Sequence, residues 1–190
     1  MSIIDFLHIT SKAKAKRLTD SETYYKSKFS FYTQYLKKYC PNYYIELYNQ
    51  CDTRHKTVET IKLKSGLYFG QEYHEVLNFL GQPSFSYRYQ DNEDHIILAY
   101  KNLEHSAFIT MTYHFYKGRL LLVGHDYANI TPDEQRDCLF TFIDQFKMSH
   151  LKKLENPFLM EDAKGNFMLA HVNRRLKVYL GSPEILSLSR

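Results

Sequence analysis

The chain has 190 residues, of which 44% are hydrophobic and 24% are charged, and its formal net charge is +4. This length and composition are typical of one folded domain with a hydrophobic core, and they argue against a largely disordered protein. The 3 cysteines form no CxxC motif, which argues against a disulfide framework and a four-thiolate zinc site. The 17 tyrosines allow two interpretations, an amphipathic contact surface or the codon usage of an AT-rich genome.

The N-terminal residues argue against export and membrane insertion. In residues 1–17 the apolar run precedes the basic run and contains Asp5, whereas a secretory signal has the opposite order. No window of the sequence has the apolar length of a membrane span. Residues 3–17 could also rest on an acidic membrane surface, but their apolar run is short. We therefore expect a cytoplasmic protein without a membrane partner.

Positive charge is concentrated in the first third of the chain. Residues 1–64 carry 12 Lys and Arg against 6 Asp and Glu, whereas residues 65–190 carry 13 against 15. This asymmetry is typical of a nucleic-acid contact, and it also describes a solvated basic arm followed by an amphipathic helix. The candidate nucleic-acid contacts are Lys12, Lys14, Lys16, Arg17, Lys26 and Lys28.

Residues 1–62 are predicted to be a helical N-terminal part. Thr19 and Glu22 form a capping-box pattern at the start of one helix, which ends before Pro41. Pro41 can open a second helix, because its fixed φ and missing amide suit the first helical position. The inward positions of this second helix are predicted to be Tyr44, Ile45, Tyr48 and Cys51.

Residues 63–126 are predicted to form a helix followed by an antiparallel sheet. Apolar residues on one face predict a helix between Gly70 and Gly81, and Pro83 prevents its continuation. The segments "SFSYRYQ", "HIILAYKN" and "AFITMTYHFYKGRLLLVGHDY" are predicted to be strands. The last segment is predicted to fold back at Lys117-Gly118.

A two-residue turn at that point predicts the pairing of the hairpin. Tyr116 pairs with Arg119, and Thr110, Thr112 and His114 then lie opposite His125, Val123 and Leu121. In this register His114 and His125 share one face of the sheet. The core face is predicted to contain Ile109, Met111, Tyr113, Phe115, Leu120 and Leu122.

Residues 127–190 are predicted to form a capped helix and a closing hairpin. Thr131 and Glu134 form a second capping box with Pro132 at the first helical position. The segment "FLMEDAKGNFMLAHVNRRLKVYLGSP" is predicted to be the C-terminal hairpin. The fold class is therefore α+β in a single domain, residues 1–190, with N-terminal helices, a helix packed on a small antiparallel sheet, a further capped helix and a C-terminal hairpin.

The order of motifs in residues 63–126 resembles a known family. Gly70 precedes Glu75 by five residues, Leu80-Gly81-x-Pro83 follows, and strands end in "YHFYKGRLLLVG". This arrangement resembles the BamE or SmpA lipoproteins of outer-membrane assembly, whose fold group includes the β-lactamase inhibitory protein. The resemblance implies helices on one face of a small sheet and a protein partner on the other. The sequence has no lipid-acceptor cysteine near its start, so the lipoprotein's role is not carried over.

The sequence offers little support for catalysis or for a bound cofactor. HExxH, GxSxG, GxGxxG and the Walker loop are absent, so we predict no catalytic residues, no cofactor and no metal site. The histidines of the strands could gather into a metal site if the strands were suitably stacked. His125 and Asp126 could form a base with its carboxylate, but neighbouring residues of a strand point to opposite faces.

These observations favour a non-enzymatic cytoplasmic protein-binding module that uses a Tyr-rich sheet face. An inhibitor or immunity role fits this class by analogy with the inhibitory protein. The first alternative is a nucleic-acid-associated protein that uses the basic N-terminal half, and the second is an enzyme with a His/Asp site on the sheet. The partner is an unidentified protein, and the sequence does not predict an oligomeric state. The predicted partner-binding residues are Tyr87, Tyr89, Tyr100, Tyr113 and His125.

Overall fold

The computed structural model describes residues 41–63, 66–89, 94–104, 107–148, 151 and 154–188. The chain divides into two units, residues 1–38 and residues 39–190, and every described residue belongs to the second unit. The predicted first helix and all six candidate nucleic-acid contacts lie outside the described residues.

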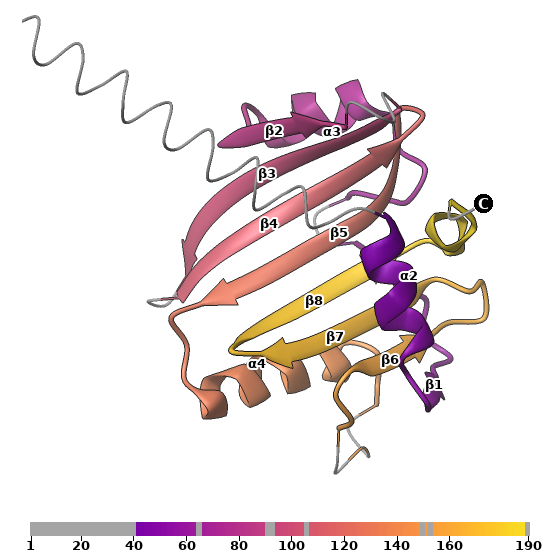
Figure 1. Ribbon diagram of the computed structural model, residues 1–190, viewed down its shortest axis with the longest axis vertical. Coiled ribbons are helices and arrows are strands. Elements are labelled where there is room, and N and C mark those ends of the chain that lie inside the picture. Colours follow the sequence, from indigo (N-terminus) through magenta and orange to yellow (C-terminus); the bar gives the residue numbers. More distant parts are fainter. Residues whose placement is uncertain are drawn as a thin grey trace, which may run out of the picture. The chain divides into compact units, whose positions relative to one another are not determined.

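The second unit is an α+β structure built on one mixed sheet of eight strands in the order β1-β6-β7-β8-β5-β4-β3-β2. β1 pairs with β6 in parallel, and the other neighbouring strands are antiparallel (Figure 1). The strands are β1 (Arg54–Lys56), β2 (Phe85–Arg88), β3 (His95–Glu104), β4 (Ala107–Tyr116), β5 (Arg119–Ala128), β6 (Phe158–Glu161), β7 (Phe167–Asn173) and β8 (Arg175–Gly181).

This sheet is larger than the predicted small one. The predicted closing hairpin is a three-stranded meander, β6-β7-β8, and β8 pairs with β5 over residues 122–127. The pairing supplies partners for backbone groups that an isolated hairpin would leave at an open edge. The two predicted strand regions therefore form one continuous sheet.

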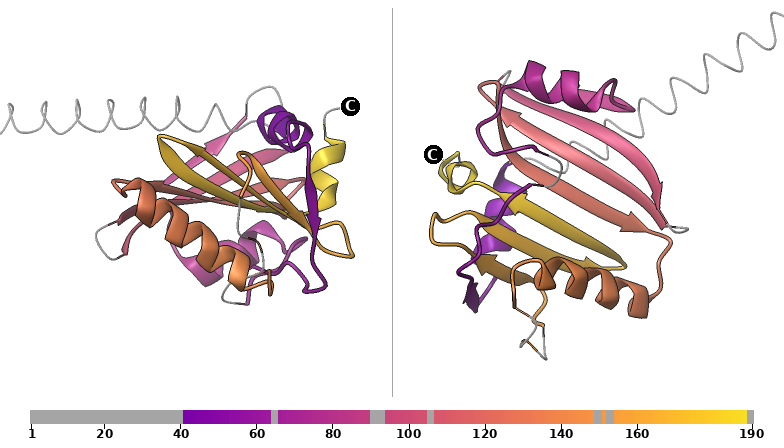
Figure 2. Two further views of the ribbon diagram at one scale, coloured as in Figure 1. Left: turned by 90° about the horizontal axis from the view of Figure 1, so that it is seen from below. Right: turned by 180° about the vertical axis from the view of Figure 1, so that it is seen from behind.

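The helices lie on both faces of the sheet. Figure 2 shows α2 (Pro41–Asn49) on one face and both α3 (Tyr73–Leu80) and α4 (Pro132–Asp144) on the other. We call these the α2 face and the α3/α4 face. A short 3-10 helix, η1 (Pro183–Ser187), follows β8. None of the helices within the described residues is long and apolar enough to cross a membrane.

Two predicted helices have the expected ends. In α4 the Thr131 hydroxyl accepts from the Glu134 amide at 3.3 Å, and the Thr131 amide donates to the Glu134 carboxylate at 2.6 Å. This is the predicted capping box, with Pro132 in the first turn. α3 ends at Gly81, which adopts φ +76° and donates its amide to the Leu77 carbonyl. A side chain at this position would strain the backbone.

The β4–β5 hairpin has the predicted turn but a different register. Tyr116 lies opposite Arg119 as predicted, and Phe115 lies opposite Leu120. His114 then lies opposite Leu122, so Leu121 is an extra residue in a β-bulge. The predicted pairing is therefore wrong beyond the bulge. Because successive side chains alternate, the shift moves His125 onto the α3/α4 face, away from His114.

Apolar side chains are buried on both faces of the sheet. On the α3/α4 face the core joins Val76 of α3 and Phe142 of α4 to the strands. On the α2 face Tyr44 is fully buried and packs against Tyr179 of β8 at a ring distance of 5.0 Å. The sheet is thus the middle layer of this unit.

Candidate functional site

The α3/α4 face contains two adjoining hollows. The first, of about 250 Å³, is lined by residues of α3 and α4 and by Lys62, Leu63 and Leu67, as well as by the sheet. The second, of about 310 Å³, lies along α4 and shares part of this lining. The residues common to both are Ile109, Tyr127, Phe142 and Gln145. We call the two hollows together the sheet groove.

The floor of the sheet groove is made by facing residues of β4 and β5. Alternation along each strand brings every second side chain to this face. Directly opposite residues of an antiparallel pair are close enough to touch, so these side chains form a continuous floor. The floor pairs are Ile109 with Tyr127, Met111 with His125, and Tyr113 with Val123.

Aromatic rings surround His125 in the groove. Its imidazole ring meets the Phe142 ring edge to face at 5.4 Å and stacks against Tyr127 at 6.4 Å. Tyr127 also meets Phe142 at 6.3 Å. β5 and α4 therefore bring together three rings, of which Phe142 is buried and Tyr127 and the polar His125 are half-buried.

Tyr113, at the end of the floor near α3, is in contact with Tyr100 of β3. Their rings meet edge to face at 5.5 Å, and the Tyr100 hydroxyl donates to the Gly81 carbonyl at 2.9 Å. Burial raises the pKa of Tyr113 to about 12, and the neighbouring Tyr100 contributes to the increase. Burial also raises the pKa of Tyr100. Both phenols are therefore neutral hydrogen-bond donors at neutral pH.

The predicted partner-binding residues divide between the two faces. Tyr113 and His125 line the sheet groove, and Tyr100 contacts Tyr113. Tyr87 lies opposite Ile97 on the α2 face, where its ring meets Tyr89 at 4.9 Å. Tyr89 in turn stacks on His95 at 4.6 Å. The five residues therefore do not share one surface.

Sequence reasoning missed several groove residues. Met111 and Tyr127 belong to the same alternating pattern as Tyr113 and His125, so the correct register would have identified both. Phe142 is buried on α4, and nothing in the local sequence indicated a hollow beside it. Two further missed residues, Lys62 and Gln145, come from an irregular segment and from the end of α4.

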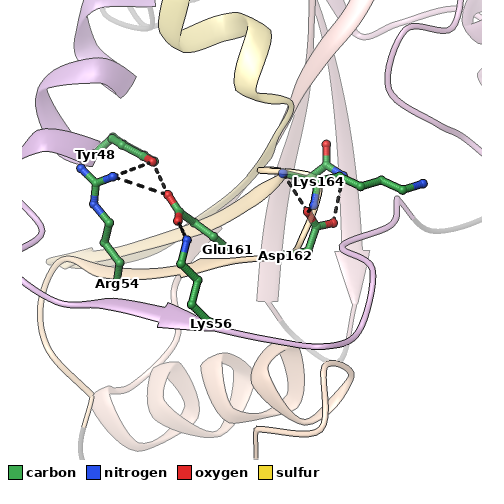
Figure 3. A network of polar contacts seen from close by, with 7 residues as sticks. Tyr48, Arg54, Lys56, Glu161, Asp162 and Lys164 are labelled. Atoms are coloured by element: carbon green, nitrogen blue, oxygen red, sulfur yellow. Dashed lines mark hydrogen bonds and ion pairs between the residues drawn. The ribbon is translucent and has the colours of Figure 1, made fainter.

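A polar cluster lies at the edge of the sheet formed by β1 and β6 (Figure 3). The buried Glu161 carboxylate contacts the Tyr48 hydroxyl and the Lys56 ammonium, and Arg54 Nη1 lies 3.9 Å from it. Burial opposes ionisation of Glu161, but its contacts with Lys56 and Tyr48 lower its pKa below the usual range. Burial and Glu161 raise the pKa of Tyr48 to about 12. The cluster therefore joins α2, β1 and β6 as a structural charge network.

Two buried histidines lie on the α2 face. His114 Nε2 is 3.1 Å from both the Tyr44 hydroxyl and Thr112 Oγ1. Burial lowers the pKa of His114 well below its ordinary value, and it lowers the pKa of His95 to about 4. Within the described ranges no group of three or more His, Cys, Asp or Glu residues could hold a metal ion. Both imidazoles are therefore neutral side chains of the protein interior at neutral pH.

The suggested base and carboxylate lie on opposite faces. His125 is paired with Met111 on the α3/α4 face, and Asp126 is paired with Thr110 on the α2 face. Asp126 is buried, and Arg175 Nη1 lies 4.0 Å from its carboxylate. The strand alternation thus separates His125 from the neighbouring carboxylate, as the sequence analysis expected.

No family model, curated protein or solved structure matches this chain.

Proposed function

We propose that this chain is a non-enzymatic protein-binding module and that the sheet groove holds the partner. The observation that carries the proposal is the aromatic and apolar floor, in which the half-buried Met111, His125 and Tyr127 adjoin the buried Tyr113 beside Phe142. Binding energy in protein interfaces is concentrated in such desolvated pockets, which receive aromatic or aliphatic anchor residues of the partner.

The size of the first hollow supports a side-chain anchor over a small-molecule site. Pockets for drug-sized ligands usually enclose about 300–1,000 Å³. The second hollow, of about 310 Å³, is at the lower limit of this range. The first hollow, of about 250 Å³, is smaller and has exposed residues such as Asn102 at its margin. It suits one or two apolar side chains of a partner that continues over the surface.

Catalysis has less support. If His125 were a general base, a carboxylate would have to fix the orientation and tautomer of its imidazole ring. The neighbouring carboxylate, Asp126, lies on the opposite face of the sheet. Among the described residues that line the first hollow, none is a carboxylate.

An inhibitor or immunity role and a cytoplasmic location belong to the proposal as well. The proposal departs from the family resemblance in one respect, since the groove lies on the same face as α3.

The proposal is tested with two substitutions in one strand that face opposite ways. Met111→Lys places a charge in the groove, whereas Phe108→Lys places it on the α2 face, where Phe108 is 54% exposed. The tagged full chain and both variants are used to capture partners from a lysate of the source organism, with a high-salt wash and nuclease treatment. Thermal unfolding confirms that the variants are folded.

We expect one defined protein to be retained by the parent chain and by Phe108→Lys, and lost with Met111→Lys. A charged side chain in a desolvated pocket costs binding free energy that a partner cannot recover. Equal retention by Met111→Lys would contradict the groove proposal. Release by salt or nuclease would instead support the nucleic-acid alternative, because phosphate contacts weaken steeply with salt.

A further inference from the structure

The two hollows of the sheet groove carry opposite charges at their margins. Among the described residues that line it, the first hollow has Lys62 and no carboxylate. The second hollow has Glu134 and Asp137 and, within the same described part of the chain, no cation. The lining that the two hollows share consists of Ile109, Tyr127, Phe142 and the exposed Gln145. The middle of the groove is therefore mainly apolar and uncharged, and its two hollows carry opposite charges.

Two of these charges are available to a partner. Lys62 and Asp137 are exposed, and neither has an ion-pair partner among the described residues. Glu134, in contrast, is engaged in the capping box of α4. Exposed charges at the rim of an interface select partners and set their orientation more than they add affinity.

The strand direction gives the length of the groove. On β4 the lining runs from Ala107 in the second hollow to Tyr113 in the first. With a rise of about 3.3 Å per residue, this span is roughly 20 Å. An extended peptide of about six residues has the same length. Lys62 and Asp137 belong to the hollows at its two ends.

We infer that the groove binds an extended peptide segment of its partner, with apolar side chains between an acidic residue and a basic residue. The acidic residue lies at Lys62 and the basic residue at Asp137, so the order of the two charges fixes the direction of the segment. This inference rests on the proposed function, because it names the kind of partner that the same groove accepts.

The experiment begins with a random decapeptide display library selected on the full chain. A selected peptide is then synthesised together with a second peptide in which its acidic and basic residues are exchanged. Fluorescence anisotropy gives the dissociation constant of each peptide for the parent chain and for the double variant Lys62→Glu/Asp137→Lys. The matched control is Lys117→Glu/Asp144→Lys, which makes the same charge changes at exposed residues outside the described lining of the groove.

We expect the parent chain and the control to prefer the selected peptide by roughly fivefold to tenfold, in the range of partly exposed ion pairs. The double variant should prefer the exchanged peptide by a similar factor. If peptides bind and Met111→Lys abolishes binding, but charge order has no effect, the inference is overturned and the groove proposal stands. Should no peptide be selected, the peptide inference is overturned, whereas the groove proposal is decided by the capture experiment. If a selected peptide binds Met111→Lys as well as the parent chain, both are overturned.

Discussion

Two glycines in neighbouring strands leave room for aromatic rings on the α2 face. Gly124 lies opposite Tyr179, and Gly181 lies opposite Phe167. A Cβ atom would lie 2.3 Å from the Phe167 ring at Gly181 and 2.6 Å from Thr112 Oγ1 at Gly124. The sequence contains Leu-Gly-x-Pro twice, and the two copies serve different purposes. Gly81 ends a helix, whereas Gly181 lies in β8 beneath a ring.

Substitution of Gly181 by alanine is therefore predicted to destabilise the fold. The Phe167 ring is fully buried and would have to move, which costs about 1–3 kcal/mol for an overpacked core. Urea denaturation measures the loss. Phe167→Leu alone is also destabilising, but in Phe167→Leu/Gly181→Ala the smaller side chain gives space to the new methyl group. The combined loss should be smaller than the sum, and strict additivity would show that this contact is not the cause.

Among the connecting segments, the β6–β7 turn depends on one carboxylate. The buried Asp162 accepts hydrogen bonds from the amides of Lys164 and Asn166 at 2.8 and 2.9 Å, which closes the turn. It also accepts from the Ile61 amide at 2.9 Å and so fixes the segment that leads to Lys62. Figure 3 shows Asp162 beside Lys164 at the end of β6. The turn and one wall of the groove therefore share a single acceptor group.

Asp162→Ala is predicted to reduce the free energy of unfolding by about 3 kcal/mol, since it leaves buried amides without an acceptor. Asp162→Asn keeps one acceptor oxygen and should lose less. Chemical denaturation of both variants checks the order, with Asp144→Ala as the control because Asp144 is exposed on α4. If Asp144→Ala and Asp162→Ala reduced the free energy of unfolding equally, the loss would not come from the hydrogen bonds that Asp162 accepts.

The elements that local sequence determines were predicted well. The α4 capping box and the Gly81 helix end depend on residues within a few positions of each other, and both are present. The extra residue Leu121 has no local signature, because a run of leucines is compatible with either register. The pairing of β8 with β5 joins residues 49 to 59 positions apart, so it also has no local signature and was missed. The groove depends on both features and on a wall formed by Lys62, Leu63 and Leu67.

Across the described unit, the histidines on the two faces of the sheet differ in burial. On the α3/α4 face His125 is half-buried at the groove, whereas on the α2 face His95 and His114 are buried. The rings of His95 and His114 lie 5.7 Å apart, so protonation of one disfavours protonation of the other. Neither can be charged without a large cost to the folded state, and acid is therefore predicted to destabilise this part of the molecule.

The direction of the pH dependence follows from His95. Burial lowers its pKa to about 4, whereas in the unfolded chain it returns to about 6.5. Between these values the unfolded state binds more protons, so the free energy of unfolding decreases as the pH falls from about 6.5 towards 4. The difference corresponds to roughly 3 kcal/mol, and His114 acts in the same direction. Stability against urea, measured at several pH values in this window, tests the expectation.

Two variants separate this effect from general acid sensitivity. His95→Phe keeps an aromatic ring against Tyr89 and removes the titrating group, so its stability should change less with pH than that of the parent chain. His74→Phe removes an exposed histidine of α3 and should leave the slope unchanged. If His95→Phe retains the full slope while His74→Phe removes it, the acid sensitivity does not come from the buried pair. The structure predicts the reverse, because only the buried imidazole loses its hydration on folding.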